Sequence, residues 1–202
     1  MRNNLKFDDF DLKLKSYAKE HKTPIILDEG LVFLNQIIKL NNVKNILEIG
    51  TAIGYSSIQM AKRNNCHIDT IERDENLFSI AKENIKLSSL NDLINVYNVD
   101  ALEAFDLFKN NKYDLIFIDA AKAQYQKFFE LYEPLLNNKG IIVCDNMNFH
   151  KLIYEDYNNL SRSVRGLVRK LQAFEEWLLN NDKYLSSIYD IGDGISLSIR
   201  KD

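Results

Sequence analysis

The feature that most constrains this chain is the alternation of short, apolar, β-branched runs with longer segments of helical periodicity. Such alternation predicts parallel βαβ units, in which each strand is buried beneath helices. No internal repeat and no Gly- or Pro-rich linker interrupts the pattern, so residues 1–202 are expected to form a single domain. Five runs are predicted to be strands: residues 45–49, 68–72, 94–99, 115–118 and 141–144.

Helices are predicted between these runs from their apolar stripes. One stripe steps by three and four residues, through Leu27, Leu31, Leu34 and Ile38. Further helices are expected near residues 8–20, 74–88, 122–136 and 160–178.

The end of the sequence follows a different pattern. Alternating runs at 186–191 and 195–199 flank Gly192-Asp193-Gly194, and this arrangement predicts an antiparallel hairpin. We therefore expect an α/β fold with a seven-stranded, mostly parallel sheet, a C-terminal antiparallel hairpin and helices on both faces. That architecture resembles the Rossmann-like class I methyltransferase fold.

Composition excludes several classes of protein. With 46% hydrophobic residues and a net charge of -3, the chain is expected to be folded, and it is not basic throughout as a nucleic-acid clamp would be. Cys66 and Cys144 form no CxxC zinc framework, and free thiols fit a reducing compartment. The charged N-terminal segment lacks the apolar core of a secretory signal, and no apolar run reaches membrane-spanning length. We expect no membrane span and a cytoplasmic location.

The strongest motif is residues 47–56, Leu-Glu-Ile-Gly-Thr-Ala-Ile-Gly-Tyr-Ser, in which a strand runs into a glycine turn that opens a helix. Gly50 and Gly54 permit close approach of the backbone to a ligand because they lack Cβ atoms. Their GxxxG spacing differs from the GxGxxG of dinucleotide sites. Glu48 is expected to accept a hydrogen bond from a cationic ligand, or to orient the loop through a water. S-adenosylmethionine, which carries an ammonium and a sulfonium, suits this chemistry.

Two further acidic positions follow the next strands. Glu72 ends the second strand, where a carboxylate can accept both ribose hydroxyls, and Asp100-Ala101 follows the third, where the adenine is expected. Taken singly, such residues can be plain turn or helix-cap positions, but their order and spacing favour an adenosyl site. The other candidate cofactor contacts are Ile25, Tyr55, Ser56, Arg73 and Asp119.

A candidate cation site lies at the ends of the fourth and fifth strands. Asp119 ends one strand and Asp145-Asn146 ends the other, so adjacent strand ends are expected to gather two carboxylates and an amide around one point. This hard oxygen set suits Mg²⁺ or another divalent cation, and without a cation the two carboxylates would repel each other. The alternatives are a helix cap for Asp119, an ordinary turn for Asp145-Asn146 and an exposed first-turn position for Lys122.

These segments together resemble the cation-dependent O-methyltransferases of the catechol and caffeoyl-CoA type. The resemblance runs from about Thr23 to Ile199 and rests on residues 47–56, 70–73, 119–122 and 145–146. It implies that Asp119, Asp145 and Asn146 hold the cation. It also implies that Lys122 takes the proton of the acceptor hydroxyl as general base beside Asp119, and that the chain forms a homodimer.

Within that family the chain looks most like the short bacterial branch that methylates 5-hydroxyuridine at the tRNA wobble position. Residues 48–56, 128–136 and 191–195 carry this likeness. Catechols offer the cation the same vicinal pair of oxygens, so a small-molecule catechol-type methyltransferase is the alternative. A non-catalytic adenosyl-binding module is a third interpretation, against which the complete cation set and Lys122 count.

The expected partner is the tRNA anticodon loop. Arg162, Arg165 and Arg169 recur on one helix face that could bind phosphates, unless that face is solvated and paired with Glu175 and Glu176. Aromatic residues that could stack on an unpaired base, or instead belong to the core, are Tyr125, Phe149, Tyr154 and Tyr157.

Overall fold

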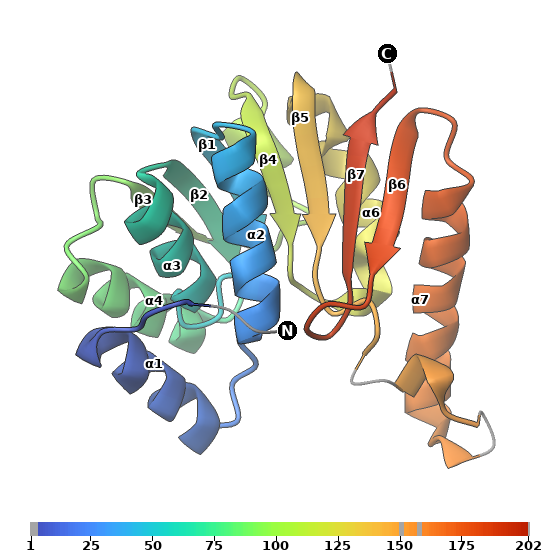
Figure 1. The fold of residues 1–202 in the computed structure, drawn as a ribbon, viewed down its shortest axis with the longest axis horizontal. Helices are drawn as coiled ribbons and strands as arrows, with labels where there is room; N and C mark the ends of the chain where they lie inside the picture. Colours follow the sequence, from blue (N-terminus) through green and yellow to red (C-terminus); the bar gives the residue numbers. More distant parts are fainter. Residues whose placement is uncertain (1–3, 150–151, 157–158, 202) are drawn as a thin grey trace.

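One seven-stranded sheet forms the centre of the molecule in the computed structural model, which describes residues 4–149, 152–156 and 159–201. The strand order is β3-β2-β1-β4-β5-β7-β6 (Figure 1). β1 to β5 pair in parallel, whereas β7 pairs antiparallel with both β5 and β6, which confirms the predicted sheet and hairpin. The strands are β1 (Asn45–Ile49), β2 (His67–Glu72), β3 (Ile94–Asn98), β4 (Tyr113–Ile118), β5 (Leu136–Cys144), β6 (Tyr184–Tyr189) and β7 (Ile195–Arg200).

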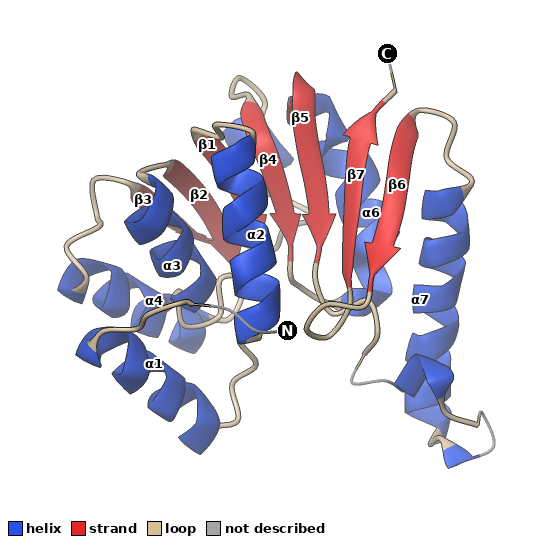
Figure 2. Cartoon of the chain, viewed as in Figure 1, coloured by secondary structure: helices blue, strands red, loops and turns tan. Residues whose placement is uncertain are grey.

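Helices cover both faces of the sheet, as predicted (Figure 2). One face carries α1 (Asp9–Glu20), α2 (Asp28–Leu40), α3 (Tyr55–Asn64) and α4 (Glu75–Leu87). The other carries α5 (Phe105–Phe108), α6 (Tyr125–Tyr132) and α7 (Arg162–Leu179). Three short 3-10 turns complete the described chain: η1 (Lys122–Gln124), η2 (Glu133–Leu135) and η3 (Leu152–Tyr154).

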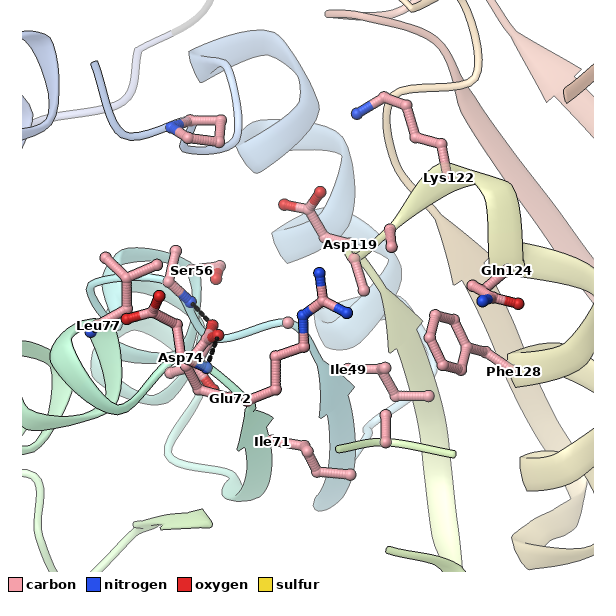
Figure 3. Close-up of a pocket in the computed structure, with 18 of the residues that line it drawn as sticks. Ile49, Ser56, Ile71, Glu72, Asp74, Leu77, Asp119, Lys122, Gln124 and Phe128 are labelled. Carbon is pink, nitrogen blue, oxygen red and sulfur yellow. Dashed lines mark hydrogen bonds between the residues drawn. The ribbon is translucent and has the colours of Figure 1, made fainter. Parts of the chain in front are cut away.

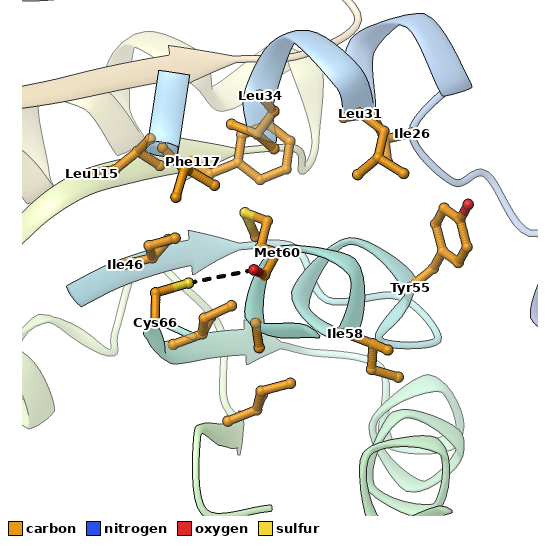
Figure 4. Packing of buried hydrophobic residues seen from close by; sticks show 14 of the residues in the cluster. Ile26, Leu31, Leu34, Ile46, Tyr55, Ile58, Met60, Cys66, Leu115 and Phe117 are labelled. Carbon is orange, nitrogen blue, oxygen red and sulfur yellow. Dashed lines mark hydrogen bonds between the residues drawn. The ribbon is translucent and has the colours of Figure 1, made fainter. Parts of the chain in front are cut away.

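The central strands are apolar throughout because helices bury them on both sides. On β4, Leu115 and Phe117 belong to the core beneath α2 and α3, while Ile116 and Ile118 belong to the core beneath α6 and α7. Leu34 of α2 packs in the first of these cores with Phe117 (Figure 4). Burial on both faces explains why the sequence shows continuous apolar runs here rather than alternation.

Several predicted element bounds were wrong. The helix expected over 122–136 is confined to α6, because η1 precedes it and Pro134, which has no N–H to donate, lies in the 3-10 turn that follows. β5 begins at Leu136 rather than at residue 141. The sequence did not predict this start because residues 137–139 are polar and interrupt the apolar run. Leu27 is not on the buried stripe of α2: it is the N-cap residue and 51% exposed.

The first helix is fixed to the third by a buried carboxylate. Asp8 and Asp11 form a capping box at the start of α1. Asp11, which is buried, also accepts hydrogen bonds from Gln59 Nε2 at 2.6 Å and Lys62 Nζ at 3.0 Å, both on α3. α3 begins directly after the glycine turn, so this contact joins the N-terminal helix to the wall of the candidate site. None of the helices in the described ranges has the length and apolar character that a bilayer span requires.

Candidate active site

A cavity of about 660 Å³ opens at the carboxyl ends of β1, β2, β3 and β4. The loops that follow these four strands line it, together with residues 24–26 before α2. In Figure 3, Ser56, Glu72, Asp74 and Leu77 lie on one side of the cavity, and Asp119 and Lys122 lie on the other. This is the edge where parallel α/β sheets bind ligands, and the volume is that of a small-molecule site.

Glycine is required at the turn after β1. Gly50 has a φ of +100°, and a Cβ atom there would lie 2.1 Å from the carbonyl oxygen of Asp119. Gly50 therefore lets the loop after β1 touch the loop after β4, and it lines the cavity. Gly54 has a different role from the one predicted: it is the left-handed N-cap of α3 and does not line the cavity.

The prediction that Glu48 touches the cofactor is not supported by its position, because this side chain is fully buried and does not line the cavity. Its carboxylate accepts hydrogen bonds from Ser56 Oγ at 2.5 Å, from Thr70 Oγ1 at 2.6 Å and from Ser57 Oγ. Glu48 thus orients the loop directly through three hydroxyls rather than through a water. Burial raises its pKa to about 7, although the three hydroxyl donors act in the opposite direction.

Glu72 lines the cavity at the end of β2, as predicted. Its Oε2 accepts from the backbone N–H of Ala52 at 2.8 Å, and its Oε1 accepts from that of Asp74 at 2.9 Å (Figure 3). Each carboxylate oxygen has a second lone pair, so Glu72 can still accept from a pair of ligand hydroxyls. The two backbone contacts fix its position between the loops after β1 and β2.

A narrow, mainly apolar part of the cavity lies at the ends of β2 and β3. Ile71, Ala101 and Phe128 line it, and Tyr132 holds Ala101 in place by donating to its carbonyl oxygen at 2.6 Å. Asp100 also lines the cavity, and its Oδ1 accepts from the N–H of Leu102 at 2.9 Å. The predicted contacts Arg73, Ile25, Tyr55 and Ser56 are lining residues as well.

These walls fit an adenosyl cofactor. The hydroxyl of Tyr55 is buried and has no hydrogen-bond partner among the described residues, so a bound ligand is free to supply one. The fixed carboxylate of Glu72 suits a diol, and the apolar part between Ile71 and Phe128 suits a flat aromatic base. The donors, acceptors and apolar surfaces of S-adenosylmethionine match these three features.

The candidate cation ligands come from the ends of β4 and β5. Asn146 Nδ2 donates to Asp119 Oδ1 at 2.7 Å, and both residues line the cavity. Asp145 is 3% exposed and does not line the cavity, while its N–H donates to the carbonyl oxygen of Ile118 at 3.1 Å. Within the described ranges no cluster of three His, Cys, Asp or Glu side chains could hold a metal, so any cation site depends on the amide as well as the two carboxylates.

The two carboxyls influence each other electrostatically. Burial and the neighbouring Asp119 raise the pKa of Asp145 well above its usual range. Burial also raises the pKa of Asp119, against the lowering effects of Lys122 and the Asn146 amide. Asp193, in the turn between β6 and β7, raises both pKa values further. Two buried acids that disfavour each other's ionisation are a suitable donor set for a divalent cation, which would remove the repulsion.

Lys122 lies in η1 and lines the same end of the cavity as Asp119 (Figure 3). Its Nζ lies 5.6 Å from the centroid of the Phe149 ring. The structure thus brings Lys122, Asp119 and Asn146 to one end of the cavity, on the loops after two adjacent parallel strands, whereas Asp145, the third predicted cation ligand, does not line it.

The predicted RNA-binding residues lie outside this cavity, on α7. Arg162 and Arg169 are exposed, Arg165 is half-buried, and neither Arg162 nor Arg169 forms an ion pair with Glu175 or Glu176 in the described chain.

Of the aromatic candidates, Tyr125 belongs to the core, the alternative to base stacking, and donates to the Asp145 carbonyl oxygen at 2.9 Å. Phe149 is half-buried beside Lys122, whereas Tyr157 and the side chain of Tyr154 lie outside the described residues.

The sequence profile of a family described as O-methyltransferase matches residues 11–201. The chain belongs to the O-methyltransferase family. An Arabidopsis thaliana protein of the caffeoyl-CoA O-methyltransferase type is 31% identical over 191 residues, which cover 93% of this chain and 82% of that one.

Solved structures of O-methyltransferases share the fold. A Staphylococcus aureus protein of the caffeoyl-CoA O-methyltransferase type is 40% identical, with a TM-score of 0.92 over 96% of this chain and 93% of that one. An O-methyltransferase from Bacillus cereus, in complex with S-adenosylhomocysteine, is 25% identical, with a TM-score of 0.83 over 98% and 93%. The class I methyltransferase fold predicted from the sequence is confirmed by these likenesses.

Proposed function

We propose that this O-methyltransferase transfers a methyl group from S-adenosylmethionine to the 5-hydroxyl of 5-hydroxyuridine in the anticodon loop of tRNA, and that it needs a divalent cation. The coarser activity, S-adenosylmethionine-dependent O-methylation of the caffeoyl-CoA and catechol type, follows from membership of the family. The need for a cation is supported by one observation: Asp119, Asn146 and Lys122 meet at one end of the cavity whose other end fits an adenosyl group.

S-adenosylmethionine supplies an electrophilic methyl group, and a divalent cation such as Mg²⁺ supplies positive charge that favours an ionised hydroxyl. Glu72 and Tyr55 would hold the cofactor, with Ile71 and Phe128 on either side of its base. Asp119, Asp145 and Asn146 would hold the cation through oxygen atoms. Because Asn146 now donates through Nδ2, its amide would have to turn so that Oδ1 faces the cation.

Lys122 is proposed to take the proton of the acceptor hydroxyl. It lines the cavity next to Asp119, whose carboxylate lies between Lys122 and the cofactor end of the site (Figure 3). The walls hold acceptor and donor in one cavity, and alignment of the two reactants supplies much of the rate in such a transfer.

The basic face of α7 supports tRNA as the acceptor. Residues 162–174 contain Arg162, Arg165, Arg169 and Lys170 and no acidic residue. α7 packs against η1, the turn that contains Lys122, so the helix that carries these charges adjoins this end of the cavity. Contacts of this kind bind phosphates, and an anticodon-loop base is already unpaired, so little energy is needed to extrude it.

One experiment separates tRNA from a small phenol as acceptor. The protein is incubated with S-adenosylmethionine and Mg²⁺, in parallel with tRNA that carries unmethylated 5-hydroxyuridine and with 3,4-dihydroxybenzoate. Methylated nucleoside, detected by mass spectrometry after digestion of the tRNA, supports the proposal. Product from the phenol alone supports a catechol-type enzyme, and binding without turnover on either acceptor supports a non-catalytic module.

A charge-reversal pair tests the role of α7 in the same assay. Arg162→Glu with Arg169→Glu is expected to lower tRNA methylation by about tenfold or more, because each lost phosphate contact weakens binding. Turnover of any small phenol should not change. The matched control is Lys82→Glu with Lys86→Glu, two exposed lysines on α4, which should leave tRNA methylation unaffected.

A homodimer is also proposed, through the outward face of β6 and β7. Leu185 and Ile199 lie opposite each other across these strands and are 60% and 40% exposed. In Figure 1 no described helix crosses in front of this part of the sheet. Asp190 and Lys201 lie at opposite ends of the face, so a two-fold axis through it would bring unlike charges together.

Light scattering after size exclusion tests the dimer. Leu185→Lys should give a monomer, whereas Leu87→Lys, a change at an equally exposed leucine on α4, should not alter the mass. A monomeric wild-type chain at micromolar concentration would contradict the proposal.

A further inference from the structure

The loop that carries Asp145 and Asn146 has an unusual backbone. Asn146 and Phe149 both have positive φ angles, +61° and +45°, in a region that side chains other than glycine rarely adopt. Such a conformation persists only where the surrounding structure holds it. The turn between β6 and β7, residues 190–194, contacts this loop and is called the clasp.

Three hydrogen bonds join the clasp to this loop. The N–H of Met147 donates to the carbonyl oxygen of Gly194 at 2.9 Å, and the N–H of Asn148 donates to that of Asp193 at 2.7 Å. The side chain of Asn148 adds a third bond, from Nδ2 to Asp190 Oδ1 at 2.6 Å. Met147 and Asn148 are both 2% exposed, whereas Asp190 is exposed, so the two backbone bonds are buried and the side-chain bond lies at the surface.

The clasp is itself packed against a rigid element. Gly192 has a φ of +61°, and a Cβ atom there would lie 3.3 Å from the backbone nitrogen of Gly30, in α2. Gly194 has a φ of +85°, and a Cβ atom there would lie 2.6 Å from the backbone nitrogen of Asn148. The clasp is therefore held between the start of α2, where a larger residue at position 192 would be tight, and the Asp145–Phe149 loop, where one at position 194 would clash.

We propose that the clasp holds the Asp145–Asn146 loop in its cation-binding shape and that Asp190 is a positioning residue for these two ligands. The inference rests on the proposed cation site. Asp190 would act through Asn148, two residues beyond Asn146, and would touch neither substrate nor cofactor. Partners of metal ligands typically change metal affinity by about 10- to 100-fold when they are removed.

The test compares Asp190→Ala with Asp190→Asn, which keeps an acceptor oxygen, and with Asp182→Ala, an exposed acid before β6. Mn²⁺ binding, followed by electron paramagnetic resonance, should weaken about tenfold in Asp190→Ala and recover in Asp190→Asn. S-adenosylhomocysteine binding should remain at the wild-type level in all three variants. Equal weakening of Mn²⁺ and S-adenosylhomocysteine binding would mean that Asp190 is merely structural and would overturn the proposal.

Hydrogen exchange gives a readout that does not depend on a metal. Exchange at the amides of Met147 and Asn148 should accelerate at least about tenfold in Asp190→Ala, while β5 keeps its protection. If Asp190→Ala changed neither the exchange rates nor the Mn²⁺ affinity, the role proposed for the clasp would be wrong, and the proposed cation site would be unaffected. Accelerated exchange in a protein that binds no Mn²⁺ even as wild type would instead overturn the cation site, and with it the assignment of Asp190 to metal ligands.

Discussion

Asn146 Nδ2 donates a 2.7 Å hydrogen bond to Asp119 Oδ1, and this contact joins the ends of β4 and β5. Asp145, next to Asn146, is buried, and burial together with the neighbouring Asp119 raises its pKa well above the usual range, while burial also raises the pKa of Asp119. The arrangement places an energetic cost at this edge of the sheet, which a bound cation would relieve. The first two predictions concern that cost.

Asp145→Asn should separate stability from activity. Removing one of two buried acids that repel each other is expected to stabilise the cation-free fold at pH 8 by at least about 1 kcal/mol, a Tm increase of roughly 2–4 °C. Turnover should fall by about 100-fold or more, while S-adenosylhomocysteine affinity is retained. Thermal melts in chelator, calorimetry and initial rates measure the three quantities. A lower Tm together with lost cofactor binding would show that Asp145 supports the fold rather than a cation.

Cation binding should become tighter as the pH rises. Burial raises the pKa values of Asp119 and Asp145, and the neighbouring Asp119 raises that of Asp145 further, so a cation must displace protons that these carboxyls retain above their usual range. Titration of Mn²⁺ in two buffers of different ionisation enthalpy should therefore show proton release, and the amount released should decrease with increasing pH. Binding that releases no proton at any pH would be inconsistent with these two acids as ligands.

Glu48→Gln should flatten the dependence of stability on pH. The pKa of Glu48 is raised from 4.5 to about 7 by burial, so the native state holds the proton more tightly than the unfolded state. Stability therefore falls as the pH rises from about 4.5 to about 7, by about 3 kcal/mol from this residue. Urea unfolding at pH 5 and pH 8 should show a smaller difference for Glu48→Gln than for wild type. The exposed Glu103→Gln serves as control, and equal differences in all three proteins would refute the argument.

Gly50→Ala should destabilise the fold by at least about 2 kcal/mol and abolish cofactor binding. The new Cβ would lie 2.1 Å from the Asp119 carbonyl oxygen, at a φ of +100° that alanine disfavours. The loops after β1 and β4 would have to move apart, and both line the cavity. Urea unfolding and S-adenosylhomocysteine calorimetry measure the two effects.

Gly166→Ala should have the opposite effect to Gly50→Ala and stabilise the fold. Gly166 lies inside α7, and a Cβ atom there would meet nothing within 4 Å. Alanine is the better helix former, so stability should increase by about 0.5–1 kcal/mol. A loss of stability in the same unfolding assay would show that something other than helix propensity acts at this position.

Features set by local sequence were predictable. The acids that end β2 and β4 follow directly from where apolar runs stop, and adjacent parallel strands bring their ends together whatever the details of packing. Gly50 was identified because a strand followed by a glycine turn leaves few other conformations.

Features set by distant contacts were not predictable. Ser57 and Thr70 bind Glu48 across a turn and a neighbouring strand, and Asp190 reaches Asn148 from the other end of the chain. The periodicity of the sequence does not indicate which distant residues form such hydrogen bonds, because serine, threonine and aspartate occur widely in loops. Glu48 was misassigned for the same reason: its position before the first glycine was visible, but its burial depended on hydroxyls that only the fold assembles.

β7 is the last strand in the sequence, yet it lies between β5 and β6 rather than at the edge of the sheet. During synthesis on the ribosome, residues up to Asn146 emerge before the segment that fixes their conformation. Strands β1 to β4, whose ends line most of the cavity, can pair before the β6–β7 hairpin is synthesised, whereas the loop after β5 contacts its partners only when that hairpin has joined the sheet. A nascent chain that lacks this hairpin is therefore expected to lack the hydrogen bonds that Met147 and Asn148 donate to it, and with them the fixed shape of the loop that carries Asp145 and Asn146.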